Sequence, residues 1–157
     1  VVRRLLQREE DLKEYYSSVL SAFELDDGHF LHKEDKSFFE KMMQIIDSHI
    51  QNTDLSVELL SSSLGYSTRQ FYRKLKNVTE KTPADIIREY RLTIVERLLL
   101  TTQLSIEEIM DKTGFSNRGT FYKAFAQKFE MTPKQYRNIK TKDVHDASEE
   151  GGGTMNV

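Results

Sequence analysis

The chain contains no cysteine and no tryptophan, and only two of its 157 residues are proline. Without cysteine it cannot form a disulfide scaffold, a thiolate nucleophile or a sulfur-ligated zinc site, and it suits a reducing compartment, so we expect a cytoplasmic protein. Seven glycines and two prolines are too few for the many turns of an all-β sandwich. The sequence also lacks a run of about 18 apolar residues that could span a membrane, so we expect no membrane contact. The small number of glycines and prolines predicts an all-α protein.

Charge is distributed unevenly along the chain, although the net charge is only −2. Residues 1–55 carry 7 basic and 12 acidic side chains, residues 56–140 carry 15 and 9, and residues 141–157 carry 1 and 4. A basic block between two acidic ones indicates a local surface for a polyanion. An ordinary solvated helix face can have the same surplus, so the positions of the basic residues have to decide between the two.

The first 36 residues predict a helical arm. Residues 3–24 have a helical composition, with Leu5, Leu12 and Val19 spaced seven residues apart. Charged residues interrupt the heptad, which leaves two interpretations: an arm that connects to and packs on an upstream domain, or a dimerising coil. The charged run at residues 33–36 predicts a solvated linker after the arm.

A short helix, a glycine turn at Gly65 and a second helix follow each other between residues 56 and 78. Glycine ends a helix readily because it adopts the left-handed conformation at little cost. The second helix opens with a capping box and a hydrophobic staple, formed by Ser67 with Gln70 and by Tyr66 with Phe71. This order predicts a helix-turn-helix.

The same pattern occurs again about 49 residues further on. The matching segments are Leu55–Glu58 with Leu104–Glu107, Leu64–Ser67 with Thr113–Ser116, Phe71–Arg73 with Phe121–Lys123, and Thr82-Pro83 with Thr132-Pro133. The offset rises by one residue, which we place near Arg118-Gly119. Two copies are too few for a solenoid and predict a pair of lobes. Each Thr-Pro pair predicts a helix start, with Thr as N-cap and Pro as the first helical residue.

The predicted architecture is all-α, with two helix-turn-helix subdomains joined by a long linker helix and preceded by the arm. The predicted ranges are an arm at 1–36, a DNA-binding domain at 37–140 with lobe one at 38–82, a linker helix at 83–101 and lobe two at 104–139, and a disordered tail at 141–157. The chain begins at Val1, with no initiating methionine and no signal-peptide pattern, so we expect a piece of a longer protein.

Several motifs between residues 38 and 138 resemble those of the AraC/XylS-type transcription regulators. They are Gly65-Tyr66-Ser67, Phe71 to Lys76, Thr82-Pro83, Arg88 to Leu92, Ile106 with Ile109, Gly114-Phe115-Ser116, Phe121 with Phe125 and Phe129, and Thr132-Pro133 with Tyr136-Arg137. The whole chain further resembles the DNA-binding output domain of hybrid two-component sensor regulators of gut Bacteroidetes. These resemblances imply double-stranded DNA as partner, an upstream sensor or receiver domain in the same chain, and RNA polymerase and a second copy as further candidates.

The second helix of lobe one separates into two faces. Its basic and aromatic positions share one stripe, and its apolar positions share the other: Arg69, Tyr72, Arg73 and Lys76 against Phe71, Leu75 and Val78. Arg69 and Arg73 suit bidentate contact with guanine in the major groove. Thr68 and Gln70, at the positive end of the helix, suit a phosphate or an adenine edge.

The corresponding helix of lobe two begins at Ser116 or Asn117, and the spacing leaves both open. The resemblance places a group of its residues toward DNA: Asn117, Arg118, Gly119, Tyr122 and Lys123. Because Gly119 has no side chain, we expect this lobe to depend more on phosphate and shape contacts than the first.

Together these features predict a sequence-specific DNA-binding transcription regulator domain that inserts two helices into successive major grooves of an asymmetric site of about two turns. The alternative is a helical adaptor whose basic face docks a protein partner. We expect no cofactor and no enzyme activity, because no catalytic constellation has a supporting context. His29 and His32 stand three residues apart without a third ligand, so we expect no metal site.

Overall fold

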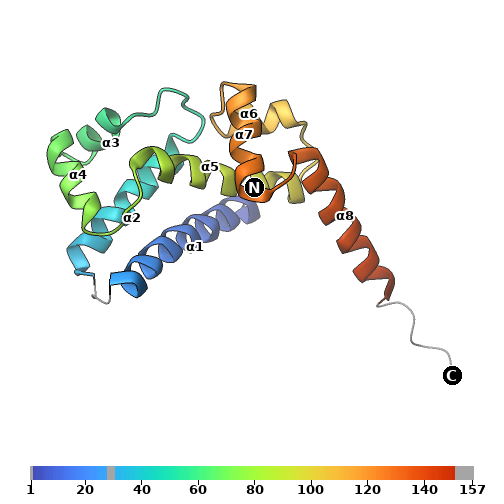
Figure 1. The fold of residues 1–157 in the computed structure, drawn as a ribbon, viewed down its shortest axis with the longest axis horizontal. Helices are drawn as coiled ribbons and strands as arrows, with labels where there is room; N and C mark the ends of the chain where they lie inside the picture. Colours follow the sequence, from blue (N-terminus) through green and yellow to red (C-terminus); the bar gives the residue numbers. More distant parts are fainter. Residues whose placement is uncertain (1, 28–30, 151–157) are drawn as a thin grey trace. The chain divides into compact units, whose positions relative to one another are not determined.

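The computed structural model describes residues 2–27 and 31–150, and the side chains of residues 8–22 and 31–143. These residues form eight helices and no strand, which confirms the all-α prediction (Figure 1). None of the helices described is both long enough and apolar enough to cross a membrane. Contacts divide the chain into two units, Val1–Arg91 and Leu92–Val157.

The first unit is built around one strongly apolar helix. Its helices are α1 (Val2–Asp27), α2 (Lys33–Ser48), α3 (Val57–Ser63), α4 (Thr68–Lys76) and the first half of α5 (Pro83–Thr101). The apolar stripe of α2 is fully buried at Phe39, Met42, Met43 and Ile46. Burying a side chain of this size contributes about 1.5–3 kcal/mol, so α2 supplies much of the core on which the short α3 and α4 depend.

The start of α2 differs from the sequence prediction. The charged run at residues 33–36, expected as a solvated linker, is the first turn of this helix. Glu34 and Asp35 stand there beside the unpaired N–H groups, where negative charge is favourable. The predicted boundary at 36/37 therefore falls inside a helix. Of the two histidines considered as metal ligands, His32 stands at the N-cap position of α2 without a side-chain capping bond, and His29 lies outside the described residues.

Helix α1 packs against another helix of the first unit. It lies alongside α2 (Figure 1), and Tyr15, Val19 and Leu20 on its inner face are buried. Val19 is one of the three heptad positions, so this position serves the first unit and is not free for a dimerising coil. The arm expected to pack on an upstream domain is, in its described part, a component of the first unit.

Polar contacts also hold α1 in place, and we call this group of Arg8, Tyr15, Asp47, Glu89 and Tyr90 the α1 latch. Arg8 Nε donates to Asp47 Oδ1 at 2.9 Å, and Tyr90 Oη donates to the same oxygen at 2.5 Å. Tyr15 Oη donates to Glu89 Oε2 at 2.9 Å. The rings of Tyr15 and Tyr90 lie 5.5 Å apart. The latch thus connects α1 to α2 and to α5.

The second unit contains the rest of α5, α6 (Ile106–Lys112), α7 (Arg118–Phe129) and α8 (Pro133–Glu150). Its core is aromatic: Phe121 and Phe125 are fully buried, and Phe125 lies 4.5 Å from Phe129 and 5.8 Å from Tyr136, ring centre to ring centre. Contacts at these distances add to the burial of the rings. The phenylalanine stripe predicted for α7 is therefore the core of this unit.

Both Thr-Pro pairs begin helices in the predicted way. Thr82 Oγ1 accepts from Asp85 N at 3.1 Å at the start of α5, and Thr132 Oγ1 accepts from Gln135 N at 3.2 Å at the start of α8. Helix α8 continues to Glu150, so the disorder predicted from residue 141 is wrong for residues 141–150. The remainder of that predicted tail, 151–157, lies outside the described residues.

Candidate nucleic-acid interface

Each unit contains a helix-turn-helix with the same turn. Gly65 and Gly114 both have φ of 79°, a left-handed conformation that glycine adopts without strain. The residue after each glycine closes the turn: Tyr66 N donates to Ser61 O at 2.9 Å, and Phe115 N donates to Met110 O at 3.0 Å. This pattern satisfies the free carbonyl groups at the ends of α3 and α6. This glycine turn sets the angle between the two helices of each motif.

Helix α4 starts with the predicted capping box. Ser67 Oγ accepts from Gln70 N at 3.2 Å, and Gln70 Oε1 accepts from Ser67 N at 3.0 Å. The predicted staple has a third member, since Tyr66 and Phe71 both pack on Phe38 of α2, with ring centres 5.8 and 5.7 Å away. The capping bond uses one lone pair of the side-chain oxygen of Gln70, and its amide NH₂ makes no capping bond.

The two faces of α4 lie as the periodicity predicts. Phe71, Leu75 and Val78 are buried, with 0–2% of their surface exposed. The opposite stripe is exposed and carries the candidate residues, namely Thr68, Arg69, Gln70, Tyr72, Arg73 and Lys76. Tyr72 is 43% exposed, which is high for an aromatic side chain. We call this exposed set the α4 stripe.

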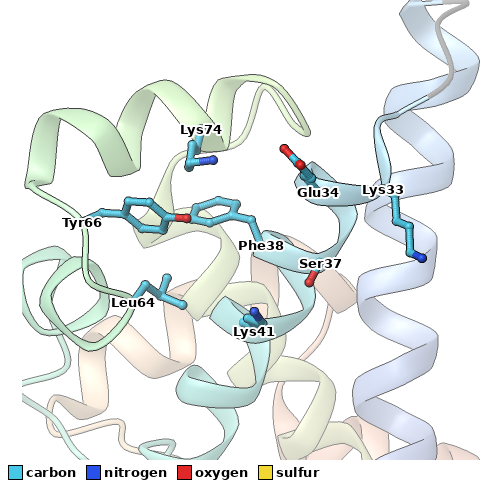
Figure 2. Close-up of a pocket in the computed structure, with 8 residues that line it drawn as sticks. All are labelled: Lys33, Glu34, Ser37, Phe38, Lys41, Leu64, Tyr66 and Lys74. Atoms are coloured by element: carbon cyan, nitrogen blue, oxygen red, sulfur yellow. The ribbon is translucent and has the colours of Figure 1, made fainter.

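Lys74 lies on the flank of α4 and not on the α4 stripe. Its Nζ is 5.2 Å from the centre of the Tyr66 ring and 5.9 Å from that of Phe38 (Figure 2). A lysine over an aromatic face is attracted by the ring electrons. These contacts border a pocket of about 410 Å³ between α4 and the start of α2. Lys74 therefore helps to hold α4 against α2, a role that its sequence spacing alone did not predict.

Asn117 is the N-cap of α7, which resolves the choice between Ser116 and Asn117. Asn117 Oδ1 accepts from Thr120 N at 2.9 Å as the N-cap. The two caps, Ser67 and Asn117, are 50 residues apart, whereas the two turn glycines are 49 apart. The extra residue of lobe two therefore lies between the glycine turn and the cap, and the predicted position near Arg118-Gly119 is wrong.

This insertion changes which residues are equivalent in the two lobes. Arg118 is the first residue of α7, as Thr68 is of α4, and Gly119 stands where α4 has Arg69. A Cβ at position 119 would lie 3.3 Å from Asn117 Oδ1, the acceptor of the cap. Glycine thus leaves room for the cap, at a position where lobe one presents an arginine.

Arg118, on the exposed face of α7, contacts side chains of both α6 and α7. Arg118 Nη1 lies 2.7 Å from Glu107 Oε1 of α6, and the guanidinium carbon lies 5.2 Å from the centre of the Tyr122 ring. Lys123 is exposed, and Tyr122 is half-buried. The structure thus brings Asn117, Arg118, Tyr122 and Lys123 to one exposed side of α7. The repeat does not reveal the contact with Glu107, because lobe one has Thr68 at the position of Arg118.

Arg137 is part of the motif that carried the family resemblance, and its side chain binds backbone carbonyl groups. Its guanidinium donates to the carbonyl oxygens of Leu99 at 3.0 Å, Leu104 at 2.7 Å and Thr102 at 3.3 Å. In the first unit Arg91 donates to Asn52 O at 2.8 Å. Each arginine thus ties down the loop that leads into a helix-turn-helix. No group of three potential metal ligands occurs among the described residues.

A family model described as a helix-turn-helix domain matches residues 60–139, from within α3 into α8. The regulatory protein SoxS of Escherichia coli K12 is 30% identical over 103 residues, which are 66% of this chain and 95% of SoxS. The chain belongs to the AraC-type helix-turn-helix family. It is therefore an AraC-family DNA-binding transcription regulator domain.

Two further similarities concern two-component proteins. Histidine kinase P4 of Formosa agariphila is 34% identical over 104 residues, which are 66% of this chain and only 8% of that protein. The C-terminal domain of the two-component response regulator yesN from Fusobacterium nucleatum has 28% identity and a TM-score of 0.58, covering 62% of this chain and 95% of that domain. This AraC-type domain is thus similar to a small part of a much larger kinase and to nearly all of a response-regulator output domain.

Proposed function

We propose that this AraC-type domain recognises a specific sequence in double-stranded DNA. The α4 stripe is the observation that carries the proposal. It places two arginines, a lysine and an exposed tyrosine on one side of a helix whose other side is buried at 0–2%. A helix with one face anchored and the other basic is suited to a major groove about 12 Å wide.

In this proposal α4 contacts bases and phosphates with different residues. Arg69 and Arg73 contact guanines through their guanidinium forks, since their planar donors match O6 and N7. Tyr72 packs against a base or sugar, and Lys76 contacts a phosphate as a point charge. Thr68 and the free amide NH₂ of Gln70 lie at the start of α4, where a phosphate is attracted.

The second lobe uses α7 in the same way but with fewer base contacts. Asn117, Arg118, Tyr122 and Lys123 contribute, and Gly119 contributes none. Because capping holds the side-chain oxygen of Asn117 at the start of α7, we propose that its amide NH₂ contacts the ligand. We therefore expect a larger share of phosphate and shape contacts from α7 than from α4.

We further propose that α4 and α7 enter successive major grooves, with α5 as spacer between lobe one at 38–82 and lobe two at 104–139. Such grooves are one turn, about 34 Å, apart. Since the two lobes differ in sequence, one chain would recognise an asymmetric site of about two turns.

The two-component similarities support a place as the output domain of a longer regulator. A sensor or receiver upstream in the same chain would supply the signal. A second copy of this chain and RNA polymerase are the further partners in this proposal. Because the proposed main partner is DNA, we also propose a cytoplasmic location.

Selection of bound sequences from random duplex DNA, followed by titration against salt, tests the proposal. We expect an enriched asymmetric site of about two turns, and a steep linear fall of log K with log salt because phosphate contacts release counterions. Equal affinity for selected and random duplexes would contradict sequence recognition. A flat salt response would favour the helical adaptor with a basic docking face.

Two variants of the α4 stripe separate base contacts from phosphate contacts. Arg73→Ala should relax preference in one half of the selected site, at a cost of about 1–3 kcal/mol. Lys76→Ala should weaken all sequences alike and lower the salt slope by about 1. If both variants bound the selected site as the unmodified chain does, the α4 stripe would not face DNA.

A further inference from the structure

The guanidinium of Arg118 is held on two sides, unlike any arginine of the α4 stripe. Its Nη1 lies 2.7 Å from Glu107 Oε1, and Nη2 lies 3.4 Å from the hydroxyl oxygen of Tyr122. The Tyr122 ring lies under the guanidinium carbon at 5.2 Å. The orientation of the Arg118 guanidinium is therefore restricted by groups on two different helices, α6 and α7.

This arrangement leaves one edge of the guanidinium available. Glu107 accepts from Nη1 and the Tyr122 hydroxyl accepts from Nη2, so the N–H of Nε and the second hydrogen of Nη2 remain for a ligand. A pair of parallel N–H groups on Nε and Nη2 matches the O6 and N7 acceptors of guanine. The contact with Glu107 thus leaves the edge that a bidentate base contact needs.

The pair restricts orientation more than it stabilises the fold. Arg118 and Glu107 are 65% and 63% exposed, and an ion pair so accessible to water adds little to folding stability. An arginine that is already oriented loses less side-chain freedom when it binds. The contact therefore acts on recognition, and it keeps Arg118 within reach of a ligand.

Lobe one has the matching carboxylate but not the matching arginine. Glu58 occupies the repeat position of Glu107, while the first residue of α4 is Thr68. At the equivalent first position of α7 the residue is Arg118, which meets Glu107 of α6. The contact is thus a particular property of lobe two.

We propose that Glu107 is a positioning residue for base recognition by α7, orienting Arg118 toward a guanine. This rests on the proposed function, in which α7 lies in a major groove. Glu107 itself contacts no base in this arrangement, and it acts through the guanidinium of Arg118.

Glu108 provides a matched control. It carries the same charge, is exposed, and shares the first turn of α6 with Glu107. Glu107→Gln and Glu108→Gln therefore change net charge and the helix dipole interaction alike, and only the first removes the carboxylate from Arg118. Arg118→Ala first identifies the base pair that depends on Arg118, as the position where preference is lost.

The measurement is the ratio of affinities for the selected duplex and for the same duplex altered at that base pair. We expect Glu107→Gln to lower this ratio about fivefold and Glu108→Gln to leave it within about twofold, since a good base contact discriminates by about 5- to 150-fold. Affinity for random duplex should rise equally in both variants, because each loses one negative charge. In an Arg118→Ala background, Glu107→Gln should have no further effect on the ratio.

Three results would contradict the inference, and they differ in whether they also contradict the proposed function. Equal ratios for Glu107→Gln and Glu108→Gln, with Arg118→Ala still losing preference, would overturn the role of Glu107 alone. A further loss from Glu107→Gln in the Arg118→Ala background would show that it acts independently of Arg118. A chain with no preference for any duplex would overturn the proposed function and the inference with it.

Discussion

The two lobes share one motif but differ in how they present it. Both turns have a glycine with φ of 79°, and both second helices begin with a side-chain cap. Lobe two has an arginine at the first position of α7, where α4 has Thr68, and a glycine at the next position, where α4 has Arg69. Successive positions differ by about 100° around the axis. Arg118 meets Glu107 from its position, whereas the arginines of α4 lie on the exposed stripe. Substitutions at these two equivalent positions thus distinguish the two ligand-facing surfaces.

The lobes also differ in what supports them. Lobe one rests on the methionine-rich α2 and on the α1 latch, a polar network that includes residues 8 and 90. Lobe two rests on stacked aromatic rings of α7 and α8. Polar networks respond to pH and to loss of a single partner, while an aromatic core responds to changes of volume. This contrast leads to different expectations for the two units.

The largest effects should come from the core phenylalanine of each motif. Phe71→Ala and Phe121→Ala each empty a fully buried site, and we expect a loss of about 3–5 kcal/mol of unfolding free energy. Hydrogen exchange should show faster exchange in α3 and α4 for the first variant, and in α6 and α7 for the second. Equal acceleration throughout the chain in both variants would show that the two units unfold as one.

The α1 latch should come next. Asp47→Ala removes the acceptor shared by Arg8 and Tyr90, and leaves the Tyr90 hydroxyl without this partner. We expect a loss of about 1–3 kcal/mol in denaturant unfolding, because an unsatisfied buried polar group carries its full desolvation cost. Asp54→Ala, at an exposed position, is the control and should stay within about 0.5 kcal/mol. Equal losses would mean that the latch does not stabilise lobe one.

Alkaline pH should weaken the first unit more than the second. Burial, with Glu89 beside Tyr15 and Asp47 beside Tyr90, raises the pKa of both tyrosines above the ordinary value of 10.0. Above about pH 10 the unfolded chain loses these protons while the folded chain keeps them, so stability is complete below that pH and falls as pH rises.

The pH effect can be measured as the unfolding free energy between pH 9 and 11, values chosen to bracket the ordinary tyrosine pKa of about 10. A Tyr15→Phe, Tyr90→Phe variant should show a shallower fall. In the second unit burial, with Glu96, raises the pKa of Tyr136 in the same direction, so a smaller fall should persist in the variant. An unchanged slope would exclude the latch tyrosines as its source.

The smallest stability effect, and the sharpest test of the site, concerns Asn117. Asn117→Ser keeps an oxygen that can cap α7, so stability should change by only a few tenths of a kcal/mol, whereas Asn117→Ala should cost about 1 kcal/mol. If the amide NH₂ of Asn117 contacts DNA, both variants should weaken binding to the selected duplex. Full binding by Asn117→Ser would make Asn117 a cap alone.

Local sequence features predicted much of the fold and the α4 stripe. The glycine turns, the capping box of Ser67 with Gln70 and the Thr-Pro starts are interactions between residues at most five apart, so their spacing is visible in the chain. The 3.6-residue period likewise separated Phe71 and Leu75 from Arg69 and Arg73. Whether the exposed residues contact DNA stays a prediction, because an exposed basic face is compatible with more than one partner.

By itself, then, the sequence determined most of the helical segments between residues 37 and 140, where most of them begin, and which face of α4 is buried. Only the tertiary structure decided that α1 packs on α2, that Lys74 lies over Tyr66, and that Arg118 meets Glu107. The physical reason is range. Caps and helical periods act within a few residues, whereas these contacts join residues 8 or more apart and depend on how packed helices bring them together.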